Sequence, residues 1–88
     1  MFEDLDEKEF SVLKEYVEYV KNKDYPLNKQ LEVLDLNEDI TLSLYSKGYI
    51  HLKVSTGIKG DIVFQYNYQI NGSLLSDEVL EYFNIKNR

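Results

Sequence analysis

Residues 41–53, TLSLYSKGYIHLK, alternate between apolar and polar side chains on either side of a short turn. A period of two is typical of strands with one buried face, so this segment predicts an antiparallel hairpin. Ser46, Lys47 and Gly48 suit its loop, because glycine readily adopts the left-handed conformation that a three-residue hairpin loop needs. The residues expected on the buried face are Leu42, Leu44, Ile50 and Leu52.

The same alternation places Tyr45 and Tyr49 on the opposite, solvent-facing side of the hairpin. On the expected register the two rings are direct cross-strand neighbours. They could stabilise the hairpin as an aromatic pair, a contribution of about 0.2–1 kcal/mol. They could also form a binding patch, because tyrosine is enriched at the energetic centres of protein interfaces. The sequence leaves both interpretations open.

Residues 6–21, DEKEFSVLKEYVEYVK, predict an amphipathic helix. Asp6 and Glu9 have the spacing of a capping box, in which each side chain accepts a hydrogen bond from the other residue's backbone. Pro26 is expected to keep this helix from continuing, because proline disfavours a helical residue before it. The apolar residues that recur with helical period are Phe10, Leu13, Val17 and Val20.

The remaining segments predict further strands and a second helix. Residues 30–36, QLEVLDL, favour a strand, and residues 62–70, IVFQYNYQI, alternate throughout and predict a longer one. Ser76 and the acids after it predict a short C-terminal helix. The stripe expected to face the core of that helix is Leu75, Val79, Tyr82 and Phe83. Residues 1–88 are therefore predicted to form a single two-layer α+β domain, a three- or four-stranded antiparallel meander packed against both helices.

The chain is acidic, with 16 acidic and 10 basic side chains and a net charge of −6. Seven of the acids lie in the first twenty residues. Such a charge attracts basic protein partners and opposes binding to nucleic acid or anionic membranes. It also suits a plain structural role, solubility and a favourable helix dipole at the N-terminal end. Both interpretations remain open.

Catalytic and metal-binding constellations are missing from the sequence. The chain has no cysteine and a single histidine, His51, so neither thiolate chemistry nor a histidine pair for zinc is available. No serine lies in a nucleophile elbow. We therefore expect a protein that is not an enzyme and has no cofactor or metal. The absence of cysteine, of a long apolar run and of a basic leader favours a cytoplasmic location.

The motif Lys21-Asn22-Lys23-Asp24-Tyr25 closes the first predicted helix, just before the expected strands. In this respect the chain resembles small acidic phage anti-CRISPR proteins that inhibit Cas9. The resemblance implies a helix followed by an antiparallel sheet, and a function as an inhibitor. In that family the carboxylates gather around the sheet loops and the C-terminal part. Here the densest group of them, seven of the sixteen, lies in the first twenty residues, so no inhibitory residue can be transferred by position.

The sequence thus predicts a small acidic, non-catalytic binding protein whose partner has a basic surface. Following the resemblance, it would be a phage-encoded inhibitor that occludes a basic nucleic-acid-binding cleft of a host defence protein. The alternative is a structural or assembly module that associates with itself through a sheet edge or through the tyrosine pair. The residues expected to contact a protein partner are Glu3, Asp6, Glu7, Glu15, Glu18, Glu38, Asp39, Tyr45 and Tyr49.

Overall fold

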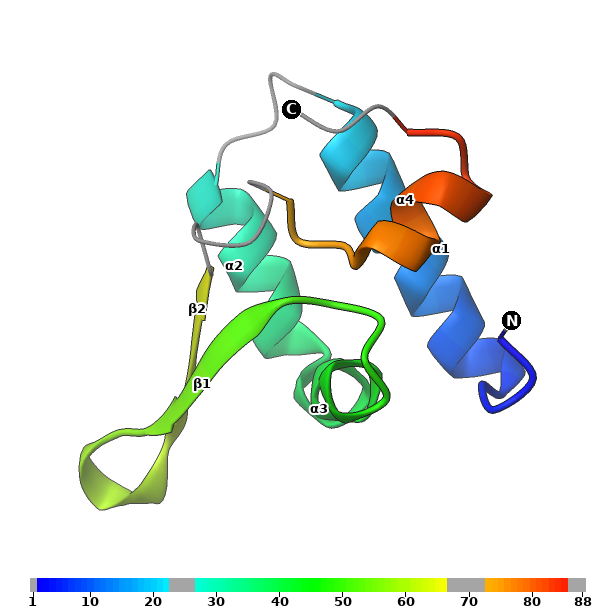
Figure 1. Cartoon of the computed structure of the whole chain (residues 1–88). Helices are drawn as coiled ribbons and strands as arrows, with labels where there is room; N and C mark the ends of the chain where they lie inside the picture. Colours follow the sequence, from blue (N-terminus) through cyan, green and yellow to red (C-terminus); the bar gives the residue numbers. More distant parts are fainter. Residues whose placement is uncertain (1, 23–26, 67–72, 86–88) are drawn as a thin grey trace.

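The computed structural model describes residues 2–22, 27–66 and 73–85. It is an α+β fold, as predicted, in which helices dominate (Figure 1). The helices are α1 (Glu7–Lys21), α2 (Leu27–Leu36), α3 (Glu38–Ser46) and α4 (Asp77–Tyr82). The strands β1 (Leu52–Thr56) and β2 (Ile62–Tyr66) are joined by a 3-10 turn, Ile58–Gly60. One cluster of buried side chains draws on all four helices and on both strands.

Two of the predicted strands are helices. Residues 30–36 belong to α2 and residues 40–45 belong to α3. The prediction of a three- or four-stranded meander is therefore wrong, and the sheet in the described part of the chain has two strands. In α3 the completely buried side chains are Thr41 and Leu44, whose spacing puts them on one helical face. The predicted strand would have buried Leu42 and Leu44 together. The helix buries Leu44 with Thr41 and leaves Leu42 half-buried.

Helix α1 begins as predicted. The Glu9 backbone N–H donates to the Asp6 carboxylate at 2.7 Å, and the Asp6 N–H donates to the Glu9 carboxylate at 3.2 Å, so the capping box is confirmed. The buried face is rotated relative to the prediction, because Phe10 is only half-buried. The buried residues of α1 are Val12, Leu13, Tyr16 and Val17.

A buried chain of hydrogen bonds connects α1, α3 and α2. The Thr41 hydroxyl donates to the Leu34 carbonyl at 3.1 Å. Its single proton is then used, so the Tyr16 hydroxyl donates to Thr41 Oγ1, at 2.7 Å. Leu34 lies in the last turn of α2, where carbonyls lack a partner within the helix. All three residues are 0 % exposed, and this burial raises the pKa of Tyr16 to about 12.

Asn37 alone separates α2 from α3. Its backbone N–H and its side-chain Nδ2 both donate to the Val33 carbonyl, at 3.2 and 3.0 Å. Its own carbonyl accepts from the Thr41 N–H at 2.8 Å and so begins α3. The chain changes direction sharply here: Figure 1 shows α3 nearly end-on, while α2 lies across the view. This bend brings Thr41 beneath the end of α2.

The turn at Ser46–Gly48 ends a helix instead of joining two strands. Gly48 has a φ of 86°, the left-handed value that the sequence predicted for it. The Tyr49 N–H donates to the Leu44 carbonyl at 3.0 Å, and the Gly48 N–H donates to the Tyr45 carbonyl at 3.1 Å. This pair of bonds defines a Schellman motif. Helix α4 ends in the same way, with Asn84 in the left-handed region at a φ of 56°.

The strands β1 and β2 pair in antiparallel register, with Val54 opposite Phe64. Their hairpin extends away from the helices (Figure 1). The predicted strand 62–70 is confirmed as far as Tyr66, and its remaining residues lie outside the described part of the chain.

Helix α4 is anchored to the segment that follows α3. The His51 N–H donates to the Leu74 carbonyl at 2.7 Å, and the Ser76 N–H donates to the Tyr49 carbonyl at 3.0 Å. Ser76 is the N-cap residue, as predicted, but its side chain makes no capping hydrogen bond. Of the residues predicted to face the core, Leu75 and Val79 are buried. Tyr82 is instead 61 % exposed.

The hydrogen bonds of Tyr16 and Thr41 should be energetically coupled. Thr41→Val should destabilise the fold by about 1–3 kcal/mol, because it leaves the Tyr16 hydroxyl buried without an acceptor. Tyr16→Phe should cost only about 0.5–1.5 kcal/mol, since Thr41 keeps its bond to Leu34. Thr41→Val should then cost less in the Tyr16→Phe background than alone. Urea denaturation of the four proteins measures these free energies, and equal costs in both backgrounds would contradict the coupling.

Candidate functional site

The nine residues predicted to bind a partner do not form one continuous site. Some precede or begin α1, two lie further along α1, two begin α3, and the two tyrosines lie at and beyond the end of α3. Each group has different surroundings, and these decide which carboxylates remain available to a partner.

The predicted tyrosine pair is wrong. Tyr45 lies in the last turn of α3 and is 40 % exposed, whereas Tyr49 follows the helix and is 8 % exposed. Because residues 40–45 form a helix, the two rings have no cross-strand relation and share no open sheet face. The Tyr49 hydroxyl donates to the Asp4 carboxylate instead. Burial and then the Asp4 carboxylate raise the pKa of Tyr49.

Several N-terminal carboxylates hold the structure together. Glu9 Oε2 accepts hydrogen bonds from the Ser43 hydroxyl and, at 2.9 Å, from Lys47 Nζ. Lys47 Nζ also donates to the Asp4 carbonyl at 2.7 Å. We call this set, Asp4, Glu9, Ser43, Lys47 and Tyr49, the Glu9 network. Hydrogen bonds from Ser43 and then Lys47 lower the pKa of Glu9 from 4.5 to about 2.

The other predicted residues of the N-terminal half are exposed, and several of them have partners within the chain. Asp6 caps α1. Glu15 accepts a hydrogen bond from the Tyr19 hydroxyl at 2.6 Å. Glu18 forms an ion pair with Lys21, in which Oε1 and Nζ are 3.9 Å apart. Glu3 and Glu7 are exposed at the start of the chain and of α1. The outward face of α1 therefore carries mixed charge that is partly neutralised locally.

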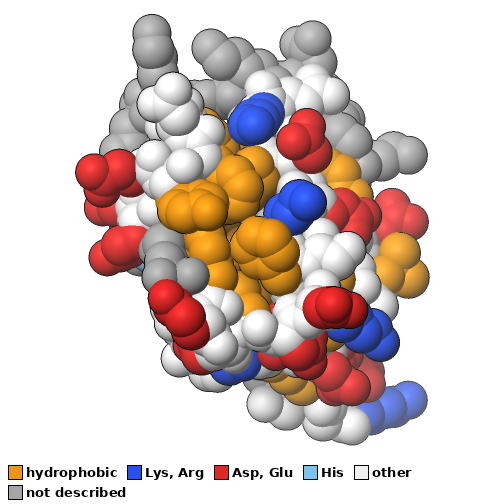
Figure 2. Space-filling view, turned by 90° about the vertical axis from the view of Figure 1, so that its right-hand side faces the viewer, with side chains coloured by type: hydrophobic (Ala, Val, Ile, Leu, Met, Phe, Trp, Pro, Cys, Tyr) orange, Lys and Arg blue, Asp and Glu red, His pale blue; other side chains and the backbone are white. Residues whose placement is uncertain are grey.

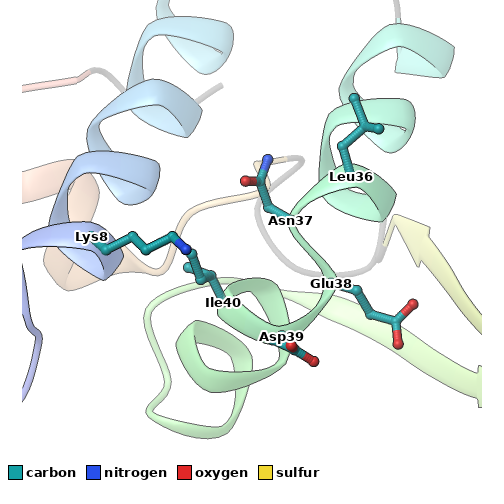
Figure 3. A pocket seen from close by; sticks show the side chains of 6 residues that line it. All are labelled: Lys8, Leu36, Asn37, Glu38, Asp39 and Ile40. Atoms are coloured by element: carbon teal, nitrogen blue, oxygen red, sulfur yellow. The ribbon is translucent and has the colours of Figure 1, made fainter.

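The most distinctive surface lies at the junction of α2 and α3. A shallow, open pocket of about 360 Å³ is present there, facing the first turns of α1 (Figure 3). Its lining residues are Lys8, Leu36, Asn37, Glu38, Asp39 and Ile40. We call it the α2–α3 pocket. Two of the predicted binding residues, Glu38 and Asp39, contribute to it.

Leu36 is the unusual feature of this pocket, because it is 78 % exposed. Figure 3 shows its side chain on the last turn of α2, while Lys8 extends from α1 toward Ile40. Glu32 and Asp35 are also exposed on α2, so residues 32–39 carry four acidic side chains and no basic one. The pocket thus combines an exposed apolar side chain with two carboxylates and one lysine, and two further exposed acids lie on α2.

This arrangement suits a basic, partly apolar segment of a protein better than a metal ion. In residues 2–22, 27–66 and 73–85 no three potential metal-ligating side chains gather. The carboxylates of Glu38 and Asp39 can pair with lysine or arginine while an apolar side chain covers Leu36. Sequence reasoning missed Leu36, Glu32 and Asp35, although a leucine between closely spaced acids is visible in the sequence. Reading residues 30–36 as a strand concealed it.

No protein-family model matches the chain, and no curated protein or solved structure is significantly similar to it. The resemblance to the anti-CRISPR family therefore stays a prediction. Of its motif, Lys21 ends α1 and Asn22 follows as the C-cap, while residues 23–25 lie outside the described part. The next described element is α2 and not a strand. Among the described residues no helix is long and apolar enough to span a membrane.

The Glu9 network should make stability depend on pH in acid. Because the folded pKa of Glu9 is about 2 and its ordinary value is 4.5, its contribution is complete above pH 4.5 and disappears as the pH falls toward 2. Glu9→Gln removes the charge and keeps a side chain that can form the capping box. The difference in free energy of unfolding between the two proteins should therefore be largest near neutral pH and shrink in acid.

Urea denaturation at a series of pH values measures this difference. Glu18→Gln is the matched control, because its carboxylate is exposed and makes only a long ion pair. If the free energy of unfolding differed between the wild type and Glu9→Gln by the same amount from neutral pH to pH 2, the role assigned to this carboxylate would be wrong.

Proposed function

We propose that this chain is a non-catalytic binding protein that engages a basic segment of a partner protein at the α2–α3 pocket. The observation that carries the proposal is the exposure of Leu36, 78 %, among the carboxylates of residues 32–39. Exposed apolar patches with polar rims are typical of binding sites, and Leu36 lies with a second apolar side chain, Ile40, in the lining of one pocket. Large apolar side chains that become buried on binding supply much of the affinity of such sites.

The charge of the partner follows from the rim of the pocket. Residues 32–39 carry four acidic side chains, two of which, Glu38 and Asp39, line the pocket together with one basic residue, Lys8. The net charge of −6 adds a long-range attraction for a basic surface. Opposite charges at an interface accelerate association and select the partner, while the buried apolar contact slows dissociation.

Inhibition by occlusion is the mechanism that fits this charge pattern. A basic segment that pairs with Glu38 and Asp39 is no longer available to the phosphates of a nucleic acid. In this proposal the partner is a host defence protein with a nucleic-acid-binding cleft, and the inhibitor is phage-encoded and acts in the cytoplasm. The identification of that partner as a CRISPR nuclease rests on the resemblance alone.

Self-association through the tyrosine pair is not retained as an alternative function, because Tyr49 is buried and bonded to Asp4. The outward acids of α1 are also weaker candidates than the pocket. Glu15 and Glu18 already have partners on the same helix, Tyr19 and Lys21.

The proposal can be tested with a synthetic amphipathic helical peptide that carries leucines on one face and lysines on the other. Fluorescence anisotropy should show binding that weakens as salt is added. Glu38→Gln with Asp39→Asn should weaken binding and flatten its salt dependence. Leu36→Ser should weaken binding by about 1–2 kcal/mol and leave the salt dependence unchanged, because it removes apolar contact and no charge.

Glu15→Gln with Glu18→Gln is the matched control, since it removes the same charge from α1. The control should retain the wild-type affinity to within a small factor. If the Glu38/Asp39 variant and the Glu15/Glu18 variant weakened peptide binding equally, binding would depend on net charge alone. The pocket would then not be the site.

A further inference from the structure

A second surface lies apart from the α2–α3 pocket, where Phe2 meets four other aromatic rings. The Phe2 ring centroid lies 5.2 Å from that of Phe10, 5.5 Å from Tyr49, 4.7 Å from Tyr82 and 6.0 Å from Phe83. We call these five residues the aromatic cluster. They come from the segment before α1, from α1 itself, from the residues after α3 and from the end of α4.

Much of the aromatic cluster remains at the surface. Tyr82 is 61 % exposed, and Phe2, Phe10 and Phe83 are half-buried, while Tyr49 lies beneath them. Figure 2 shows hydrophobic side chains gathered in a continuous patch on the face that carries the N-terminal segment, with charged side chains around it. A contiguous exposed apolar patch of this kind marks an interaction site more often than isolated apolar residues do.

Two charged side chains of opposite sign lie at the borders of the patch. On the α1 side, Lys14 Nζ lies 5.8 Å from the centroid of the Phe10 ring. On the α4 side, Glu78 is exposed and precedes Tyr82 by one helical turn, so both project from the same face of α4. A patch with a lysine at one border and a glutamate at the other can pair these two residues with a second copy of itself. A two-fold axis in the plane of contact, between the borders, brings each lysine opposite the other copy's glutamate.

We propose that the aromatic cluster is the contact surface of a two-fold symmetric homodimer. Tyr82 of each copy packs on the exposed rings of the other, and Lys14 of each copy faces Glu78 of the other. A protein partner of uniformly basic charge would be repelled by Lys14 at this border, whereas a second copy satisfies both borders at once. The aromatic cluster and its two charged neighbours are far fewer than the roughly 20–30 residues that each side of a stable interface contributes, so the dimer is weak and depends on concentration.

Sedimentation velocity over a wide range of concentration tests the proposal. The wild-type chain should shift from monomer toward dimer as its concentration rises. Tyr82→Ser should raise the dimer dissociation constant by roughly thirtyfold, the loss typical of an aromatic residue at the centre of an interface. Circular dichroism should show that this variant remains folded, because Tyr82 is mostly exposed.

A charge exchange tests the symmetry without touching the rings of the aromatic cluster. Lys14→Glu alone and Glu78→Lys alone should each weaken the dimer, because each places like charges opposite one another. The double variant restores opposite charges and should recover the wild-type dissociation constant. Leu36→Ser is the control, since it removes an exposed apolar side chain elsewhere and should leave dimerisation unchanged.

Three results would overturn the homodimer: a monomer at every concentration, a dimer that persists in Tyr82→Ser, or a double variant no better than the single ones. Peptide binding at the α2–α3 pocket reports separately on the proposed function. Tyr82→Ser should not change it, so either proposal can fail while the other stands.

Discussion

The buried hydrogen bonds that link Tyr16, Thr41 and Leu34 determine how the three long helices are arranged. A tyrosine hydroxyl that is 0 % exposed needs an acceptor, and Thr41 supplies it while donating its own proton to the end of α2. The bond to Leu34 is possible only because the chain bends at Asn37 and turns α3 beneath α2. The orientation of α1, the bend and the start of α3 therefore depend on one another, and the α2–α3 pocket is a surface consequence of the bend.

Local signals in the sequence were sufficient for the ends of the elements. The capping box of Asp6 and Glu9, the left-handed Gly48 and the N-cap position of Ser76 all depend on neighbouring residues, and all were predicted correctly. The type of element that each of these residues begins or ends depends on contacts with distant parts of the chain. A glycine after a turn suits both a hairpin loop and a helix C-terminus, and residues 40–45 are too short to distinguish period two from period three. The hydrogen bond between Thr41 and Tyr16, which is 25 residues away in the sequence, favours the helix.

The candidate site was only partly predictable for the same reason. Every acid of the N-terminal segment looks alike in sequence, but Glu9 is bound by Ser43 and Lys47, and Asp4 by Tyr49, across the fold. Glu38 and Asp39 were predicted, and they lie at a pocket because the helix before them ends in an exposed leucine. Pro26 was predicted to keep the first helix from continuing, and α1 ends at Lys21, before it; the next described element, α2, starts at Leu27.

The N-terminal segment holds Phe2 in place within the aromatic cluster. Phe2 has a φ of 75°, a conformation unfavourable for a bulky side chain, so contacts elsewhere must hold it there. Those contacts are its four neighbouring rings, the bond from the Leu5 N–H to the Phe2 carbonyl and the attachment of Asp4 to Lys47 and Tyr49. Asp4 thus helps to position an aromatic residue through its bonds to Lys47 and Tyr49. The proposed function therefore assigns the basic partner to the α2–α3 junction, where Leu36 is exposed and the Glu9 network does not reach.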